Sequence, residues 1–168
     1  STVQTLAAYL DDEITAMPNL VTVGAGGTAS TVAGIPFFSA DNSIYTHDVS
    51  GTDDTAQHNA AYGIGAMDAI TTGDQNSALG YNALSANNTG AQNTAMGRLS
   101  LEANTSGDNN TAYGSSTLSA NSTADDNTAI GKGSMQANTT GAANTAVGKD
   151  SLKANTTGTR NLAIGYQA

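Results

Sequence analysis

The chain has 168 residues, of which 14 are acidic and 5 are basic, and it contains no cysteine. The net charge of −9 argues against a surface that binds nucleic acid, and the lack of cysteine excludes a disulfide framework and thiolate chemistry. Aromatic residues make up 5% of the chain and tryptophan is absent, so a core of ordinary thickness would be difficult to fill. The abundant glycine, asparagine, threonine and alanine favour a narrow structure that is dense in backbone.

Residues 1–18 predict a short amphipathic helix, which Pro18 would end. Its apolar stripe consists of Leu6, Leu10, Ile14 and Met17. A stripe this short is marginal alone, so we expect a docking or self-associating helix; packing against the chain's own repeats is the alternative. The N-terminus lacks the basic start and apolar block of a secretory signal. No run is long enough for a transmembrane helix, so we expect no insertion into a membrane.

Residues 19–41 predict an adaptor that joins the helix to the rest of the chain. Residues 21–23 and 35–38 have the composition of short strands, and a glycine-rich turn separates them. Residues 42–58 predict a degenerate rung that caps the array behind them, as terminal repeats often do. Asn42 lies 17 residues before Asn59, and the residues after Asn42 echo the start of the later units.

Residues 59–168 repeat with a strict period of 17 residues, a register that a disordered chain has no reason to keep. Each unit starts with asparagine, has an apolar fourth residue and a glycine fifth, and ends near Asn-Thr-Thr-Gly or a relative of it. The asparagines are Asn59, Asn76, Asn93, Asn110, Asn127, Asn144 and Asn161. The glycines are Gly63, Gly80, Gly97, Gly114, Gly131, Gly148 and Gly165. The fourth residues that we assign to a trimer or lumen column are Leu79, Met96, Tyr113, Ile130, Val147 and Ile164.

A unit of this length holds two strands of about five residues or three very short ones, and is too short for a helix-turn-helix repeat. We therefore predict an all-β fold, a parallel β-solenoid with one unit in each rung. The invariant glycine and the Asn-Thr-Thr-Gly segment are expected at two corners, where a positive φ suits glycine and asparagine. Identical asparagines one rung apart are expected to form an amide ladder along the axis.

Each expected strand carries two adjacent apolar residues, such as Ala146 and Val147. Side chains alternate between the faces of a strand, so one of the two faces the lumen and the other faces outward. The outer side of the strand then needs a cover. A rung with so few large apolar side chains is marginal in isolation, and we predict that three copies associate as a homotrimer.

The segment Asn-Thr-Ala-Ile-Gly-x-x-Ser at residues 127–134 recurs at 144–151 and, modified, at 161–168. It resembles the head repeats of trimeric autotransporter adhesins, the YadA-like heads. Units with the additional Asn-Thr-Thr-Gly are similar to those in fibre and spike proteins of tailed bacteriophages. The resemblance covers residues 59–168. It implies a left-handed parallel β-roll that assembles as a trimer, with the apolar pair facing the lumen and the trimer axis.

From this resemblance we expect a structural virion protein, a trimeric phage tail fibre, spike or collar appendage that takes part in host attachment, and no enzyme. The unit is longer than in the autotransporter heads, and we expect no signal peptide, coiled-coil stalk or membrane barrel, an expectation that favours the virion. Residues 1–41 would bind other virion proteins, and a host cell-surface receptor is a further candidate partner. The alternatives are the head of a bacterial trimeric autotransporter adhesin at the cell surface and a monomeric solenoid such as an ice-binding protein.

His47 and His58 flank Asp48, Asp53 and Asp54, a combination that suggests a metal site. Their spacing matches no zinc or calcium motif, so we favour a solvated acidic loop and predict no metal or cofactor. Residues 48–52 imitate the Asp-x-Ser-x-Thr pattern of metal-dependent adhesion sites but lack the α/β domain that frames such a site.

Threonine pairs such as Thr139-Thr140 raise the hypothesis of an ice-binding array. Adjacent residues on a strand point to opposite faces, and these pairs precede glycine, so turn formation is the favoured interpretation. The Asn-x-Ser/Thr sequons at Asn104 and Asn138 arise from the repeat itself and need no glycan. No Ser-His-Asp or paired-carboxylate arrangement stands on a plausible scaffold.

Overall fold

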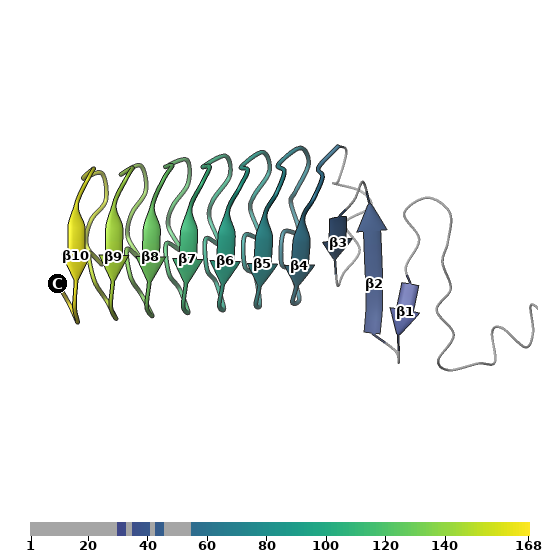
Figure 1. Ribbon diagram of the computed structural model, residues 1–168, viewed down its shortest axis with the longest axis horizontal. Helices are drawn as coiled ribbons and strands as arrows, with labels where there is room; N and C mark the ends of the chain where they lie inside the picture. The colour runs from purple at the N-terminus through teal and green to yellow at the C-terminus, as the bar shows by residue number, and fades with distance from the viewer. Residues whose placement is uncertain (1–29, 33–34, 41–42, 46–54) are drawn as a thin grey trace, which may run out of the picture.

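The computed structural model describes residues 30–32, 35–40, 43–45 and 55–168. Its ten strands form one sheet, in which each strand pairs with its neighbours in sequence. The strands are β1 Ser30–Val32, β2 Ile35–Ala40, β3 Ser43–Tyr45, β4 Ala60–Tyr62, β5 Ser77–Leu79, β6 Thr94–Met96, β7 Thr111–Tyr113, β8 Thr128–Ile130, β9 Thr145–Val147 and β10 Leu162–Ile164. Figure 1 shows β4 to β10 side by side, one strand in each coil of an extended array. The prediction of an all-β parallel solenoid is confirmed for this part of the chain.

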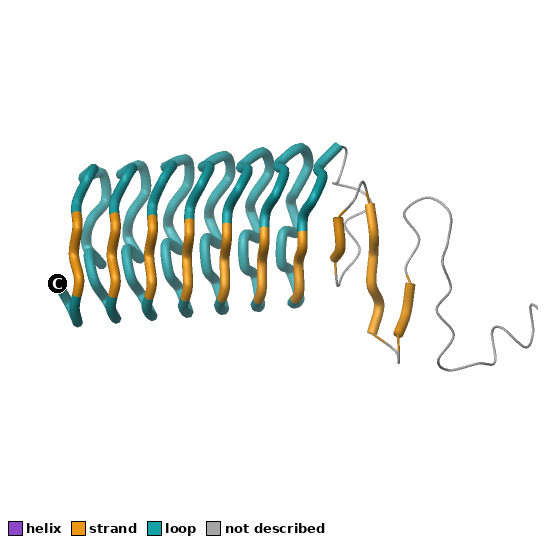
Figure 2. Tube along the Cα trace, viewed as in Figure 1, coloured by secondary structure: helices purple, strands orange, loops and turns teal. Residues whose placement is uncertain are grey.

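Each rung contains a single strand of three residues, so the expectation of two or three strands in a rung was wrong. The remaining residues form turns (Figure 2), yet their backbone still bonds along the axis to the next rung. The N–H of Leu84 donates to the carbonyl of Ser100 at 3.0 Å, and the N–H of Leu101 donates to the carbonyl of Thr117 at 3.1 Å. The hydrogen-bonding groups of the main chain are therefore satisfied by the stacking of rungs and not by long strands.

The interior of the coil is narrow and is filled by columns of like residues. Alanine at the third position of the rung is buried against the sheet, as at Ala112 and Ala146, which are 0% exposed. Leucine or methionine at the ninth position fills the opposite side. Its fully buried members are Met67, Leu84, Leu101, Leu118 and Met135. A lumen with one large apolar side chain in most rungs, and two in the first (Met67 and Ile70), explains the low aromatic content.

The invariant glycine after each strand has the expected positive φ. Gly131 has φ +125, and a Cβ there would lie 2.5 Å from the carbonyl oxygen of Gly148 in the next rung. The corresponding expectation for Asn-Thr-Thr-Gly was wrong, because no residue of that segment in the described rungs has a positive φ. Its glycine avoids crowding, because a Cβ on Gly141 would lie against the carbonyl oxygen of Gly158, although Ala124 holds the equivalent place in another rung.

Positive φ values fall instead at three other positions of the rung. The ninth position is one of these places, with φ 51 at Leu101, and the seventh is another, with φ 55 at Ser116. The seventeenth position, just before the invariant asparagine, is the third, with φ 60 at Asp126. A bulky leucine in the left-handed region is strained, and its complete burial offsets that strain.

At its N-terminal end the array meets an antiparallel unit. β1 pairs with β2 and β2 pairs with β3, both antiparallel, and β3 then pairs in parallel with β4. The strand expected at residues 35–38 lies within β2. The 17-residue spacing of the expected capping rung predicts Ser43 opposite Ala60, but Ile44 lies opposite Ala60, so the register differs by one residue. Because β4 pairs with one edge of β3, β2 occupies the other edge, which faces away from the array.

Several predictions fall on residues that the structure does not describe. The amphipathic helix of residues 1–18, with Leu6, Leu10, Ile14 and Met17, lies outside the described residues, as do the strand expected at 21–23 and most of the loop at 46–58. Within the described residues, no helix is long and apolar enough to cross a membrane.

Candidate interaction surface

The outer face of the sheet carries a continuous column of apolar side chains, exposed in most rungs and partly buried at Met96 and Val147, which we call the outer column. In each strand the alanine points into the coil and the residue after it points outward. In β7, Ala112 is 0% exposed and Tyr113 is 56% exposed. In β8, Ile130 is 40% exposed beside the buried Ala129. The outer column consists of Tyr62, Leu79, Met96, Tyr113, Ile130, Val147 and Ile164. The apolar residues of the trimer or lumen column thus lie outside the lumen.

The register of the sheet makes this column continuous. Leu79 pairs with Met96, and Tyr113 pairs with Ile130, without a shift from one rung to the next. On one side of the column lies the second position of the rung, the first residue of each strand, which holds Thr94, Thr111, Thr128 and Thr145 in four successive rungs. On the other side, beyond the glycine, lies the sixth position.

The sixth position adds further exposed apolar and cationic side chains. Ile64 is 79% exposed and Tyr81 is 50% exposed. The guanidinium of Arg98 lies 6.0 Å from the centre of the Tyr81 ring, and the ammonium of Lys149 lies 5.1 Å from the centre of the Tyr166 ring. These contacts run between rungs, so the sixth position is also a column. Sequence reasoning missed this column, because its residues include apolar, polar and charged types with no common character.

The outer column and the apolar residues of the sixth position together form a band, which is the most distinctive surface of the described chain. Monomeric soluble proteins seldom expose a contiguous apolar patch of this kind, and larger patches mark sites of interaction. In a parallel stack the backbone of the inner strands is already paired, so only side chains are offered to a partner. The surface is therefore suited to association through packing and not through added strands.

The invariant asparagines lie inside the coil at the amino end of each strand. The main-chain N–H of Asn110 donates to Oδ1 of Asn93 at 2.9 Å, and Nδ2 of Asn110 donates to the carbonyl of Ala124 at 2.8 Å. Nδ2 of Asn110 also lies 3.2 Å from Oδ1 of Asn93. The predicted amide ladder is present, but its shortest bonds run from the main chain to the side chain.

A second amide ladder, which sequence reasoning missed, lies at the twelfth position. Nδ2 of Asn121 donates to Oδ1 of Asn104 at 3.0 Å, and Nδ2 of Asn138 donates to Oδ1 of Asn121 at 3.0 Å. These asparagines are the sequon residues, and Asn104 and Asn138 are 0% exposed. The asparagines of the interior Asn-Thr-Thr-Gly segments are therefore buried structural residues, although threonines of the same segments, such as Thr140, are exposed.

The threonines that follow these asparagines serve the turn. The hydroxyl of Thr105 donates to the carbonyl of Ser122 at 3.0 Å, and that of Thr139 donates to the carbonyl of Thr156 at 3.0 Å. The hydroxyls at the thirteenth position are thus engaged with the next rung. This agrees with turn formation as the role of the threonine pairs.

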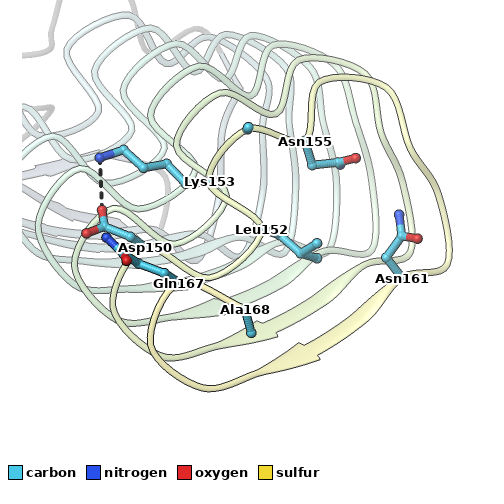
Figure 3. A pocket seen from close by; sticks show the side chains of 8 residues that line it. Asp150, Leu152, Lys153, Asn155, Asn161, Gln167 and Ala168 are labelled. Atoms are coloured by element: carbon cyan, nitrogen blue, oxygen red, sulfur yellow. Dashed lines mark ion pairs between the residues drawn. The ribbon is translucent and has the colours of Figure 1, made fainter.

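The last complete rung contains the ion pairs that the structure shows. The ammonium of Lys153 lies 3.0 Å from Oδ1 of Asp150, and that of Lys149 lies 3.6 Å from Oδ2. The hydrogen bond from Lys153, aided by the charges of Lys153 and Lys149, holds the pKa of Asp150 below its ordinary value. Figure 3 shows this pair outside the coil, while Leu152 and Asn161 lie within it. A hollow of about 500 Å³ at the last rung is lined in part by Asp150, Leu152, Lys153 and Asn161.

The metal hypothesis falls mainly outside the described residues. His47, Asp48, Asp53 and Asp54 are not described, and His58 is an exposed residue with φ 60. Among residues 55–168 and the described strands, no three histidine or acidic side chains are grouped as a metal site would require.

A scan against protein-family models and searches of curated proteins and of solved structures found no match to this chain. The resemblance to trimeric adhesin heads and phage fibres therefore stays a prediction, as do the handedness of the coil and the number of associated copies.

Proposed function

We propose that this chain is a structural virion protein, a homotrimeric phage tail fibre, spike or collar appendage that takes part in host attachment. The single observation that carries the proposal is the outer column, a row of apolar side chains that faces away from the core in every rung. Three copies with parallel axes would bring their three columns together around a common axis. Each copy then supplies the cover that the others lack.

The strict repetition supports a rod rather than a compact domain. Each rung in residues 59–168 pairs with the next in the same register, so the apolar surface is straight and extends along the whole array. A straight apolar band fits another straight band of the same period. Residues 1–41 would hold the trimer on the particle through other virion proteins, and the array would project toward a host cell-surface receptor.

The first experiment is the mass of the chain in solution, measured by sedimentation equilibrium. The proposal predicts a species of three times 16.7 kDa. A monomer at micromolar concentration would overturn it, and would favour a solitary solenoid that uses its stacked threonines for binding.

The location is tested separately by electron microscopy with antibodies against residues 59–168. Labelling of virus particles is the expected result. Labelling of the bacterial surface in the absence of particles would instead favour the head of a trimeric autotransporter adhesin, which shares the same trimer.

A further inference from the structure

The two edges of the sheet's outer face carry complementary charges. The sixth position of each rung, just after the strand, forms what we call the carboxyl edge. The sixteenth and seventeenth positions, just before the next strand, form the amino edge. The basic residues of the carboxyl edge are Arg98, Lys132 and Lys149, which follow β6, β8 and β9. The acidic residues of the amino edge are Asp74, Asp108, Asp125 and Asp126, which precede β5, β7 and β8.

The two patterns are the same pattern displaced by one rung. Acids stand at β5, β7 and β8, and bases stand at β6, β8 and β9. Without displacement, only Lys132 would face an acidic residue. With a displacement of one rung in the opposite direction, Arg98 would face Asp108, but Lys132 would face no acidic residue and Lys149 would face Arg160. With each base set against the rung before it, Arg98 faces Asp74, Lys132 faces Asp108, and Lys149 faces Asp125 and Asp126.

These pairs cannot form within one chain, because the two edges lie on opposite sides of the strand. In the described residues, neither Arg98 nor Lys132 takes part in an ion pair, and both are exposed. The ammonium of Lys149 lies 3.6 Å from Oδ2 of Asp150, but Asp150 also follows β9 and so belongs to the same side of the sheet as Lys149. Asp126 is exposed and has a positive φ. Asp74, Asp108 and Asp125 each accept a main-chain hydrogen bond from the preceding rung through Oδ1, at 2.7, 2.7 and 2.8 Å, and their Oδ2 atoms are the oxygens offered to a neighbouring copy.

Rotational symmetry decides which edges of neighbouring copies meet. In a ring of parallel copies the strands all run in the same sense around the axis, so each contact is head to tail. The carboxyl edge of one sheet then meets the amino edge of the next. A two-fold pair would instead set like patches against each other.

We propose that adjacent copies in the trimer meet along this seam, with the carboxyl edge of one copy set one rung toward the N-terminus of the next. The inference rests on the proposed trimer and adds its contact and register. A displacement of one rung is about 4.8 Å, which requires only that the strands be inclined to the trimer axis. The outer columns pack at the centre, and the charged seam fixes which rungs face each other.

The test is a charge reversal with two alternative compensating changes. Asp126→Lys sets a base against Lys149 in the proposed register and against Lys132 in an undisplaced one. A trimer has three seams, so even a small like-charge repulsion acts three times, and we expect the association constant to fall about tenfold. Sedimentation equilibrium of the full chain at low salt measures this constant. The effect should shrink in about 1 M NaCl, where the screening length is about 3 Å.

The proposed register predicts that Lys149→Glu restores association of the Asp126→Lys variant and that Lys132→Glu does not. Glu102→Lys is the matched control, since it makes the same charge change away from both edges, and should leave the constant unaltered. Circular dichroism verifies that each variant keeps its fold.

Restoration by Lys132→Glu, or a native trimer that Asp126→Lys does not weaken, would refute the seam while leaving the trimer in place. A native chain that is monomeric would refute the trimer itself, and the two failures are therefore distinct.

Discussion

Oδ1 of Asn127 accepts two hydrogen bonds from Asn144 of the next rung, one from its main-chain N–H at 3.0 Å and one from its Nδ2 at 3.1 Å. Asn127 in turn donates through Nδ2 to the carbonyl of Gly141 at 2.9 Å. The side chain thus connects two rungs and one turn inside the coil. A buried amide must be satisfied, and here each rung depends on its neighbour for that satisfaction.

The second amide ladder predicts that an interior break costs more than a break at its end. Asn121→Ile removes both the acceptor of Asn138 and the donor to Asn104, and should lower the free energy of unfolding by about 2–4 kcal/mol. Asn87→Ile removes the acceptor of Asn104 and the donor to the carbonyl of Gly90 but breaks the ladder on one side only, so the loss should be about half. Ile70 already occupies this place in the first rung. Denaturant unfolding at one fixed protein concentration measures both, and equal losses would contradict the prediction.

Two glycine substitutions separate backbone strain from crowding. Gly131→Ala adds a Cβ at φ +125 and 2.5 Å from the carbonyl oxygen of Gly148, and should cost at least about 2 kcal/mol. Gly141→Ala meets crowding alone, since its φ is not positive, and the chain already carries Ala124 at the equivalent place. We expect the smaller loss at Gly141. A Gly141→Ala variant that is the less stable of the two would disprove this order.

A charge in the outer column should prevent association without unfolding the rung. Ile130→Lys sets an ammonium among apolar residues of the other copies, where its desolvation is unfavourable, so the expected product is a folded monomer. Thr140→Lys is the control, because Thr140 is exposed in the turn of the same rung. Light scattering gives the mass of each. Unchanged association of Ile130→Lys would show that the column lies outside the contact.

The ion pair of Asp150 predicts a titration that can be followed by NMR. Its hydrogen bond with Lys153 lowers the pKa of the carboxyl below its ordinary value. A carboxyl with a lowered folded pKa stabilises the fold above its unfolded pKa, and this contribution is lost as the pH falls through the folded pKa. Lys153→Gln should move the pKa of Asp150 upward. A pKa that does not respond would indicate that the pair is not formed in solution.

The 17-residue period determined much of this fold before any coordinates. It predicted a parallel stack, the positive φ of Gly131 and its equivalents, and an amide ladder at Asn127 and its equivalents. Those features repeat in every rung, and a residue that repeats at fixed spacing meets its own copy in the next coil. The outward orientation of one residue in each apolar pair also followed from strand alternation alone.

Only the tertiary structure decided which residue of the pair faces out. Ala146 lies inside because the coil is narrow on that side, and Val147 lies outside although it is the larger side chain. The left-handed backbone of Leu101 could not be read from its type, because burial in the lumen imposes a conformation that its local preference opposes. The one-residue shift at Ile44 likewise follows from pairing with β4 and not from spacing. Repetition is a property of the sequence, whereas the direction of each side chain depends on the space that stacking leaves.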